Sequence, residues 1–336
     1  MARRGFLTAG CWCVDRNITV PYWPGEDVVV RVTGVERAGG GSACNLGIDI
    51  RKLDPTMPVA TTGIVGADEA GAFLKGLAGA HGMDHRHLVA VPGVRTMVTD
   101  AYMSAASGKR THVLFEGSNN DLTPDHIMTE GQARVFHLGL PGIHATMDAP
   151  WGAHANGWAA VLERARGTGM ETSLELVTIA PERTRAIVLP CLAHLSVLVV
   201  NDHEIGALAG VETVQGGQTD RAACFAAAET VLARGAMDCV AVHFTMGAVL
   251  VARDGSRVFQ PSVAVPEGAV KGVNGAGDAF AAGFLYGLHE GWDYRRRLQL
   301  AHAAAAACIR ALGTYDGVMS ARDCLALAAE WGWRAG

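Results

Sequence analysis

The sequence has no excess of positive charge. Its 28 Lys and Arg residues are outnumbered by 33 Asp and Glu residues, which gives a formal net charge of −5 and a pI near 6.2. A protein that binds DNA or RNA generally needs a basic surface that neutralises phosphates. We therefore expect no nucleic-acid partner.

Long apolar segments and paired cysteines are also missing. A membrane-spanning helix needs about 18 or more apolar residues in a row, and the apolar stretch after Arg4 is interrupted by Asp15 and Arg16. Cys11 and Cys13 have no second Cys or His pair at metal-ligand spacing, so core packing explains them better than a metal site. We expect buried thiols, a cytoplasmic protein and no membrane partner.

Apolar, β-rich segments alternate with helical patterns along the whole chain, which is typical of a parallel sheet covered by helices. The expected strands are Phe6–Val14, Val59–Val65, Val135–Leu138, Thr172–Leu176, Leu195–Val200 and Cys239–Phe244. The expected helices are Ser42–Leu53, Glu69–His81, Ala153–Arg166, Thr219–Arg234, Ala276–Glu290, Arg296–Leu312 and Ala321–Trp331. This order predicts an α/β fold.

Two segments break the alternation. Asp27–Thr33, and the pair Thr96–Ala105 and Thr111–Glu116, are predicted strands with no helix between them, and the pair resembles a hairpin. We predict a small antiparallel lid from residues 15–37 and 95–117, beside a main domain of residues 1–14, 38–94 and 118–336. Its apolar face would be covered by closure over a ligand or by a second subunit, so a homodimer through the lid is an expected arrangement.

The glycine-rich segment at 272–278 carries the strongest chemical signal. Gly275 and Gly277 precede an Ala-rich helical run, and the first amides of such a helix, together with its dipole, favour an anion. Asp278 would lie beside that anion, where a carboxylate can accept a proton from an attacking hydroxyl. The simpler alternative is that Asp278 only complements the helix dipole and that the glycines only permit a turn.

The segment fits neither common nucleotide motif. It lacks the Lys-Ser/Thr ending of a P-loop, and Phe280 occupies the last glycine position of a dinucleotide fingerprint. It also lies near the C-terminus, whereas a dinucleotide-binding domain shows its glycine pattern after an early strand.

A second group of residues lies near the N-terminus. Gly40 and Gly41 precede a predicted helix that contains Asn45, and Asp15 follows the first predicted strand. Such residues could bind the hydroxyl groups of a polyol. The alternative is a flexible loop with Ser42 as the helix N-cap.

Asn201 and Glu204 form a third group, directly after an apolar strand. Asn followed three residues later by Glu is a capping box, which explains the spacing without catalysis. The functional interpretation places Glu204 near bound phosphates, where it would orient Mg²⁺, in part through water.

Taken in order, these segments resemble the ribokinase/PfkB family of carbohydrate and nucleoside kinases over nearly the whole chain. The matching residues are Asp15, Gly40, Gly41, Asn45, Gly63, Val65, Gly66, Asp68, Asn201, Glu204 and Gly275–Asp278. The resemblance implies a doubly wound, three-layer α/β sandwich with a mostly parallel central sheet and a small antiparallel β lid. It also implies ATP and Mg²⁺ as cofactors and phosphorylation of a hydroxymethyl group on a sugar or sugar-like molecule.

The resemblance assigns roles to individual residues. Asp278 matches the family's catalytic base, and Gly275, Ala276 and Gly277 match its anion hole. Substrate hydroxyls would be held by Asp15, Gly40, Gly41 and Asn45, and the nucleotide by Asn201, Thr245, Gly247 and Asn274, with Glu204 associated with Mg²⁺.

Two functions other than that of a sugar kinase stay open. Asn274 precedes Gly-Ala-Gly-Asp, as it does in adenosine kinases of this family, which favours a nucleoside kinase. A non-catalytic relative that binds a sugar or nucleotide is the second alternative, although Asp278 and both turn glycines are retained.

Two departures from the family pattern matter. Gly272-Val273 stands where relatives usually have Asp-Thr. A carboxylate associated with monovalent-cation activation is thus missing, and we expect weak or no potassium dependence. Glu175 stands where many sugar kinases carry the Asp of Asp-x-Asn, and the Asn is absent.

Overall fold

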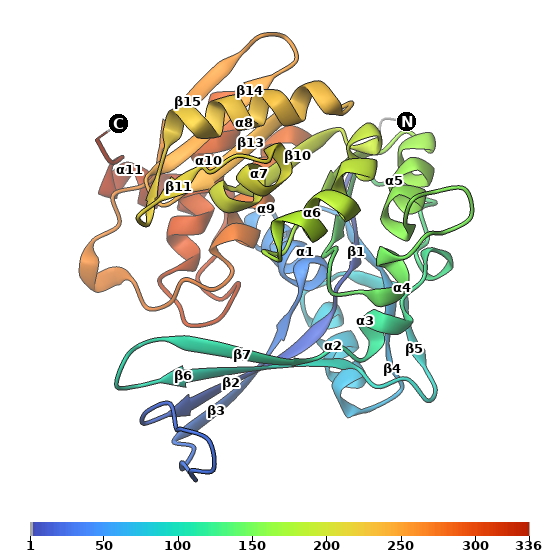
Figure 1. The fold of residues 1–336 in the computed structure, drawn as a ribbon, viewed down its shortest axis with the longest axis vertical. Helices are drawn as coiled ribbons and strands as arrows, with labels where there is room; N and C mark the ends of the chain where they lie inside the picture. Colours follow the sequence, from blue (N-terminus) through green and yellow to red (C-terminus); the bar gives the residue numbers. More distant parts are fainter. Residues whose placement is uncertain (1–2, 336) are drawn as a thin grey trace.

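The computed structural model describes residues 3–335, which form an α/β sandwich and a separate smaller sheet (Figure 1). The large sheet has the strand order β15-β14-β13-β10-β9-β8-β1-β4-β5, in which the pairs β13–β14 and β14–β15 are antiparallel and all other pairs are parallel. Its strands are β1 (Phe6–Gly10), β4 (Val59–Gly66), β5 (Asp84–Val91), β8 (Val135–Gly139), β9 (Glu171–Leu174), β10 (Val197–Asn201), β13 (Cys239–Phe244), β14 (Gly247–Ala252) and β15 (Arg257–Pro261). The predicted fold class is confirmed.

Alternation along the strands creates two hydrophobic cores, one on each face of the sheet. In β10, Val199 belongs to one core and Val200 to the other, and Phe6 and Leu7 of β1 divide in the same way. Both faces are buried, so β1 and β10 consist mainly of apolar residues, as parallel strands usually do.

Helices cover both cores. The first core is covered by α1 (Ser42–Leu53), α2 (Glu69–Ala80), α9 (Ala276–His289), α10 (Tyr294–Cys308) and α11 (Ala321–Trp331). The second is covered by α4 (Ala145–Asp148), α5 (Gly157–Gly167), α6 (Pro181–Val188), α7 (Asp202–Ala209) and α8 (Arg221–Arg234). The remaining short elements are α3 (Ser118–Asp121), β11 (Val214–Gln215), β12 (Gln218–Thr219) and 3₁₀ turns at Pro124–His126, Leu189–His194 and Glu267–Ala269.

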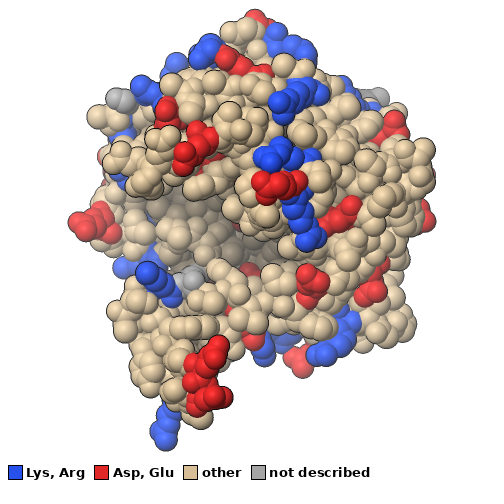
Figure 2. Space-filling view, in the orientation of Figure 1, with Lys and Arg blue, Asp and Glu red and all other residues tan. Residues whose placement is uncertain are grey.

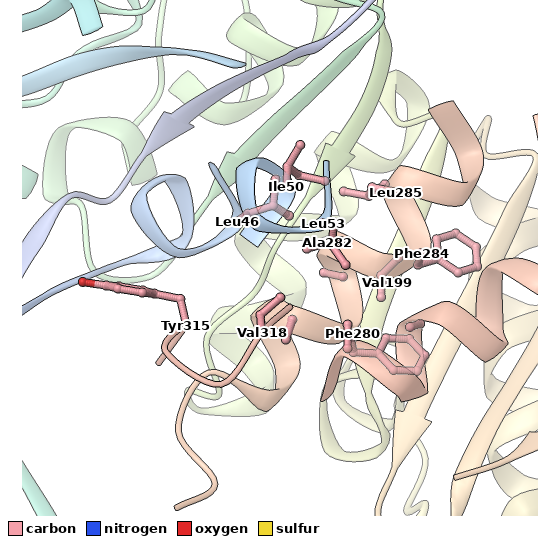
Figure 3. Packing of buried hydrophobic residues seen from close by; sticks show 14 of the residues in the cluster. Leu46, Ile50, Leu53, Val199, Phe280, Ala282, Phe284, Leu285, Tyr315 and Val318 are labelled. Carbon is pink, nitrogen blue, oxygen red and sulfur yellow. The ribbon is translucent and has the colours of Figure 1, made fainter. Parts of the chain in front are cut away.

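Helices α1 and α9 pack against each other within the first core. Leu46 and Ile50 of α1 face Ala282 and Leu285 of α9 (Figure 3), and all four side chains are buried. Burial of this kind stabilises by roughly 1.5–3 kcal/mol per large aliphatic side chain. The contact therefore holds two helices that are distant in sequence in a fixed relation.

The smaller sheet has the order β3-β2-β6-β7 and stands off the main body (Figure 1). It consists of β2 (Cys13–Val20), β3 (Gly34–Gly40), β6 (Met97–Ser104) and β7 (Arg110–Phe115). Its outer pairs are antiparallel, as predicted for a lid, while β2 and β6 run parallel. Because β2 follows β1 almost directly, the chain passes from one sheet into the other.

Two strand predictions were wrong in detail. Phe6–Val14 is divided between β1 and β2, which belong to different sheets. Asp27–Thr33 is not a strand: Asp27 has a φ of 61°, Val29 is 91% exposed, and pairing with β2 begins only at Gly34. A valine-rich run becomes a strand only where a neighbour offers backbone partners. In the described chain this run has one such bond to β2, from the N–H of its last residue, Thr33, to the Thr19 carbonyl at 2.8 Å.

Some helix limits also moved. The helix predicted from Ala153 starts at Gly157, because the Asn156 side chain accepts a hydrogen bond from the Ala159 N–H and caps it. All eight cysteines lie in the described part and are buried with free thiols. Among residues 3–335, the helices are all too short or too polar to span a bilayer.

Candidate active site

Helix α9 begins at a turn that requires glycine. Gly275 is its N-cap with a φ of 74°, and a Cβ there would overlap the carbonyl oxygen of Thr314. The Ala276 N–H makes a 3.4 Å bond to the Val273 carbonyl, and within residues 3–335 no side chain caps the helix. First-turn amides of a helix lack intrahelical partners, so this end can accept an anion.

Asp278 lies in the first turn of α9 and is held by a residue of α1. The Asn45 side-chain amide donates to Asp278 Oδ2 at 3.4 Å, and the Thr314 hydroxyl donates to Asn45 Oδ1 at 3.1 Å. Sequence reasoning missed Thr314, which lies in a loop far from any motif. The bonds show that the α1–α9 packing brings the predicted base and a predicted substrate residue together.

Asp15 reaches the same place from β2. Its carboxylate lies directly over Gly40, where a Cβ would overlap it, and Gly41 has a φ of 89° with Cys11 in the way of any side chain. Burial is the main cause that raises the pKa of Asp15 to about 6, and the charge of Asp278 contributes to this rise. The substrate residues predicted from the N-terminal segment thus surround one point near Asp278.

A second carboxyl group lies against Asp278. Glu175, directly after β9, is within hydrogen-bonding reach of it, and His137 Nε2 of β8 lies 2.9 Å from Glu175 Oε2. Burial, then the charge of Glu175, raises the pKa of Asp278 well above its usual range, and burial raises that of Glu175 to about 7. Sequence reasoning noted Glu175 but missed His137, whose only signal was a polar residue inside an apolar strand.

Asp49 is another carboxyl that sequence reasoning missed. It lies on α1 one turn after Asn45, is fully buried, and neither oxygen has a hydrogen-bond partner in the described structure. Burial raises its pKa well above the usual range, with the charge of Asp278 the next cause. Burial without a hydrogen-bond partner therefore favours the neutral form of this carboxyl group.

A cavity of about 740 Å³ opens on the other side of the α9 N-terminus. Of the predicted residues, Asn201, Thr245, Ala276 and Gly277 line it. Gly247 and Asn274 are not on its walls in the described chain: Gly247 is buried at the start of β14, and the Asn274 carbonyl accepts from the Cys308 thiol at 3.4 Å.

Aromatic side chains that sequence reasoning missed form one wall of this cavity. Phe280 lies between His243 and His302, with ring centroids 4.8 and 5.0 Å away. Burial lowers the pKa of His243 to about 4 and that of His302 to about 3, so both rings are neutral. A neutral aromatic wall beside an anion site suits a ligand with a flat ring and a charged tail.

Asn201 and Glu204 form the predicted capping box at the start of α7. The Asn201 side chain accepts from the Glu204 N–H at 2.8 Å, and Glu204 Oε2 accepts from the Asn201 N–H at 3.0 Å. Glu204 Oε1 accepts from the Thr178 hydroxyl at 3.4 Å. Within residues 3–335, no group of three or more His, Cys, Asp or Glu could hold a metal ion.

Figure 2 shows a hollow between the main body and the smaller sheet, with walls formed mostly by residues other than Lys, Arg, Asp and Glu.

Comparison with known proteins places this geometry in a family. A model described as pfkB family carbohydrate kinase matches residues 10–321. Adenosine kinase of Saccharomyces cerevisiae is 26% identical over 209 residues, a match that spans 59% of this chain and only 56% of that protein's length.

Solved structures show the same fold. Arabidopsis thaliana ribokinase complexed with ribose and ATP has a TM-score of 0.78 at 20% identity, covering 98% of this chain and 99% of that one. The Burkholderia thailandensis nucleoside kinase in complex with inosine has a TM-score of 0.74 at 17% identity, covering 98% and 100%. With its family model matched across most of its length, the chain belongs to the pfkB family of carbohydrate kinases.

Proposed function

We propose that this protein is an ATP-dependent phosphotransferase that phosphorylates a hydroxymethyl group of a sugar or nucleoside. One observation carries the proposal: Asp278, which accepts from the Asn45 amide and feels the charge of Asp15, lies in the first turn of α9. Ala276 and Gly277 of the same turn line the cavity with the aromatic wall. Family membership supports the same reaction class.

The reaction follows from this placement. The proton of the acceptor's primary hydroxyl moves to Asp278 as its O–H bond breaks. The acceptor oxygen then bonds to the γ-phosphorus while the bond from that phosphorus to the bridging oxygen breaks, and ADP leaves. The amides of Gly275, Ala276 and Gly277 stabilise the charge on the transferring group, so catalysis is mainly positioning and electrostatic stabilisation.

The nucleotide side is proposed to hold ATP with Mg²⁺. Asn201 and Thr245 border the cavity, and Gly247 and Asn274 would act through the backbone next to it. When bound, Mg²⁺ would neutralise phosphate charge. Glu204 would orient its water shell, because both carboxylate oxygens already accept protein hydrogen bonds.

A nucleoside is the second candidate acceptor. Cys11, Cys13 and Met97 form a small apolar cluster with Leu140 and Ile143, and the Cys13 thiol donates to Asp15 Oδ1 at 3.3 Å. An apolar cluster next to the carboxylate proposed to bind hydroxyl groups suits a base more than a bare sugar. The adenosine kinase similarity points the same way.

The function is tested by assaying purified protein with ATP, Mg²⁺ and separate acceptors: ribose, fructose, adenosine and inosine. We expect at least one acceptor to release ADP well above the rate of ATP hydrolysis alone, with phosphate on the primary hydroxyl by ³¹P NMR. Thermal shifts with the same ligands report binding separately. Ligand binding without transfer by any acceptor would instead support the non-catalytic alternative.

We also propose that residues 15–37 and 95–117 act as a lid through which two copies pair. Val35, Val113 and Phe115 are roughly half exposed on one face of this sheet. Such a face is usually covered. Sedimentation velocity should show a dimer, and Val113→Glu should shift it toward monomer; a wild-type monomer at micromolar concentration would refute the pairing.

A further inference from the structure

Asp278 belongs to a row of three side chains from three separate elements. His137 of β8 is almost inaccessible, with 1% of its side chain exposed, and contacts Glu175, whose side chain is 18% exposed. Glu175 in turn contacts Asp278 at the start of α9. Neither His137 nor Glu175 is needed for the proton transfer described above, so the contact requires another explanation.

Two partly buried carboxyl groups in contact do not both ionise readily, since each charge disfavours the other. Such a pair holds one proton over a wide pH range and titrates as a unit. The surrounding residues do little to stabilise two negative charges, because Asn45 supplies only one 3.4 Å bond to Asp278 and the anion site lies on the far side of Asp278. The state of Asp278 therefore depends on Glu175.

We propose that Glu175, oriented by His137, is a positioning residue that shares a proton with Asp278 and thereby sets the pH range in which Asp278 acts as the base. This inference rests on the proposed function, because it concerns the same transfer. It adds that the protonation of the base is controlled by His137 of β8 and by Glu175, which follows β9.

His137 is suited to hold Glu175. Its Nδ1 atom is buried without a partner in the described structure, and burial lowers the pKa of the ring to about 4. The ring is therefore neutral. With the proton on Nε2, it donates to Glu175 Oε2 at 2.9 Å and fixes that carboxyl group against Asp278.

Other titratable groups also face the pair. From β2, α1, α7 and β8 they are Asp15, Asp49, Glu204 and His137, and Lys52 of α1 faces Asp49. Of these, Glu204 raises the pKa of Glu175, and Asp15 and Asp49 each have their own pKa raised by Asp278. These nearby acidic groups further disfavour a negative charge on both Glu175 and Asp278, which favours a shared proton.

The test is the pH profile of kcat and of kcat/KM for Glu175→Gln, with whichever acceptor the wild type phosphorylates. A charge at Glu175 raises the pKa of Asp278, so its removal lets Asp278 ionise at lower pH. The acidic limb of the pH profile should move to lower pH by about one unit or more, while the KM for ATP changes little. Glu175→Asp keeps the charge and should keep the limb near its wild-type position.

Glu130→Gln makes the same chemical change on an exposed residue and should leave the profile unchanged. An acidic limb that stays in place in Glu175→Gln, with kcat lowered equally at every pH, would mean that Glu175 is only structural and would overturn the inference.

A second measurement does not depend on turnover. Because both carboxyl pKa values are raised in the folded protein, folding becomes less favourable as pH rises from the unfolded value through the folded value. Glu175→Gln and Asp278→Asn should each reduce the loss of Tm between pH 5.5 and 8. In the double variant, the loss of Tm should be reduced by no more than in the single variant with the larger effect. Additive gains would refute the shared proton. If no acceptor is phosphorylated, the proposed function is refuted. The Tm comparison of the single and double variants would still show whether Glu175 and Asp278 share a proton.

Discussion

Asp278→Asn is expected to lower kcat by about 100- to 10,000-fold, the usual contribution of a positioned general base. An Asn has nearly the same shape, and its side-chain oxygen can still accept from the Asn45 amide, which lies 3.4 Å from Asp278 Oδ2. It cannot accept the proton of the acceptor hydroxyl at neutral pH. The loss should therefore fall on kcat, measured by ADP release, rather than on the fold.

ATP affinity separates loss of the base from loss of the site. Isothermal titration with ATP and Mg²⁺ should give a Kd within a few-fold of the wild type, because the cavity that the nucleotide would occupy lies on the other side of the α9 N-terminus. Asp125→Asn, the same change on an exposed residue, should leave kcat intact. Wild-type turnover by Asp278→Asn would remove Asp278 from the chemistry altogether.

Local sequence patterns predicted the parts of the site that single segments build. The Gly275–Asp278 turn and the Gly40–Asn45 segment are short runs in which glycine and a helix start fix the geometry. The alternation of apolar strands with helices gave the fold class, because burial on both faces leaves a clear apolar pattern. These features depend on few contacts between distant segments.

Contacts between distant segments could not be predicted in this way. His137 and Glu175 meet because β8 and β9 are neighbours in a particular register, with Leu138 opposite Leu174. Thr314 reaches Asn45 from a loop that carries no motif. The error at Asp27–Thr33 has the same cause, since strand formation there depended on a partner, and the partner β2 pairs with Gly34–Gly40 instead. Register and pairing are properties of the assembled sheet.

Gly275→Ala is expected to lower kcat by about 100-fold or more, comparable to the loss of a donor from an oxyanion hole. An Ala at a φ of 74° is strained, and its Cβ would overlap the Thr314 carbonyl oxygen. The turn must therefore shift. The first amides of α9 would then leave the positions from which they bind the transferring phosphoryl group, and Asn45, which accepts from the Thr314 hydroxyl, would move with them.

Gly255→Ala provides the matched control for this change. Gly255 has a φ of 88°, but nothing lies within 4 Å of a Cβ there, and it belongs to the turn between β14 and β15. It carries a strain of roughly 1–2 kcal/mol without the overlap, so it should lower Tm and leave kcat unchanged. A loss of Tm in both variants with a kcat defect confined to Gly275→Ala would tie turnover to that turn. If Gly275→Ala instead kept wild-type kcat, the α9 amides would have no part in the transfer, because their positions cannot survive the overlap with Thr314.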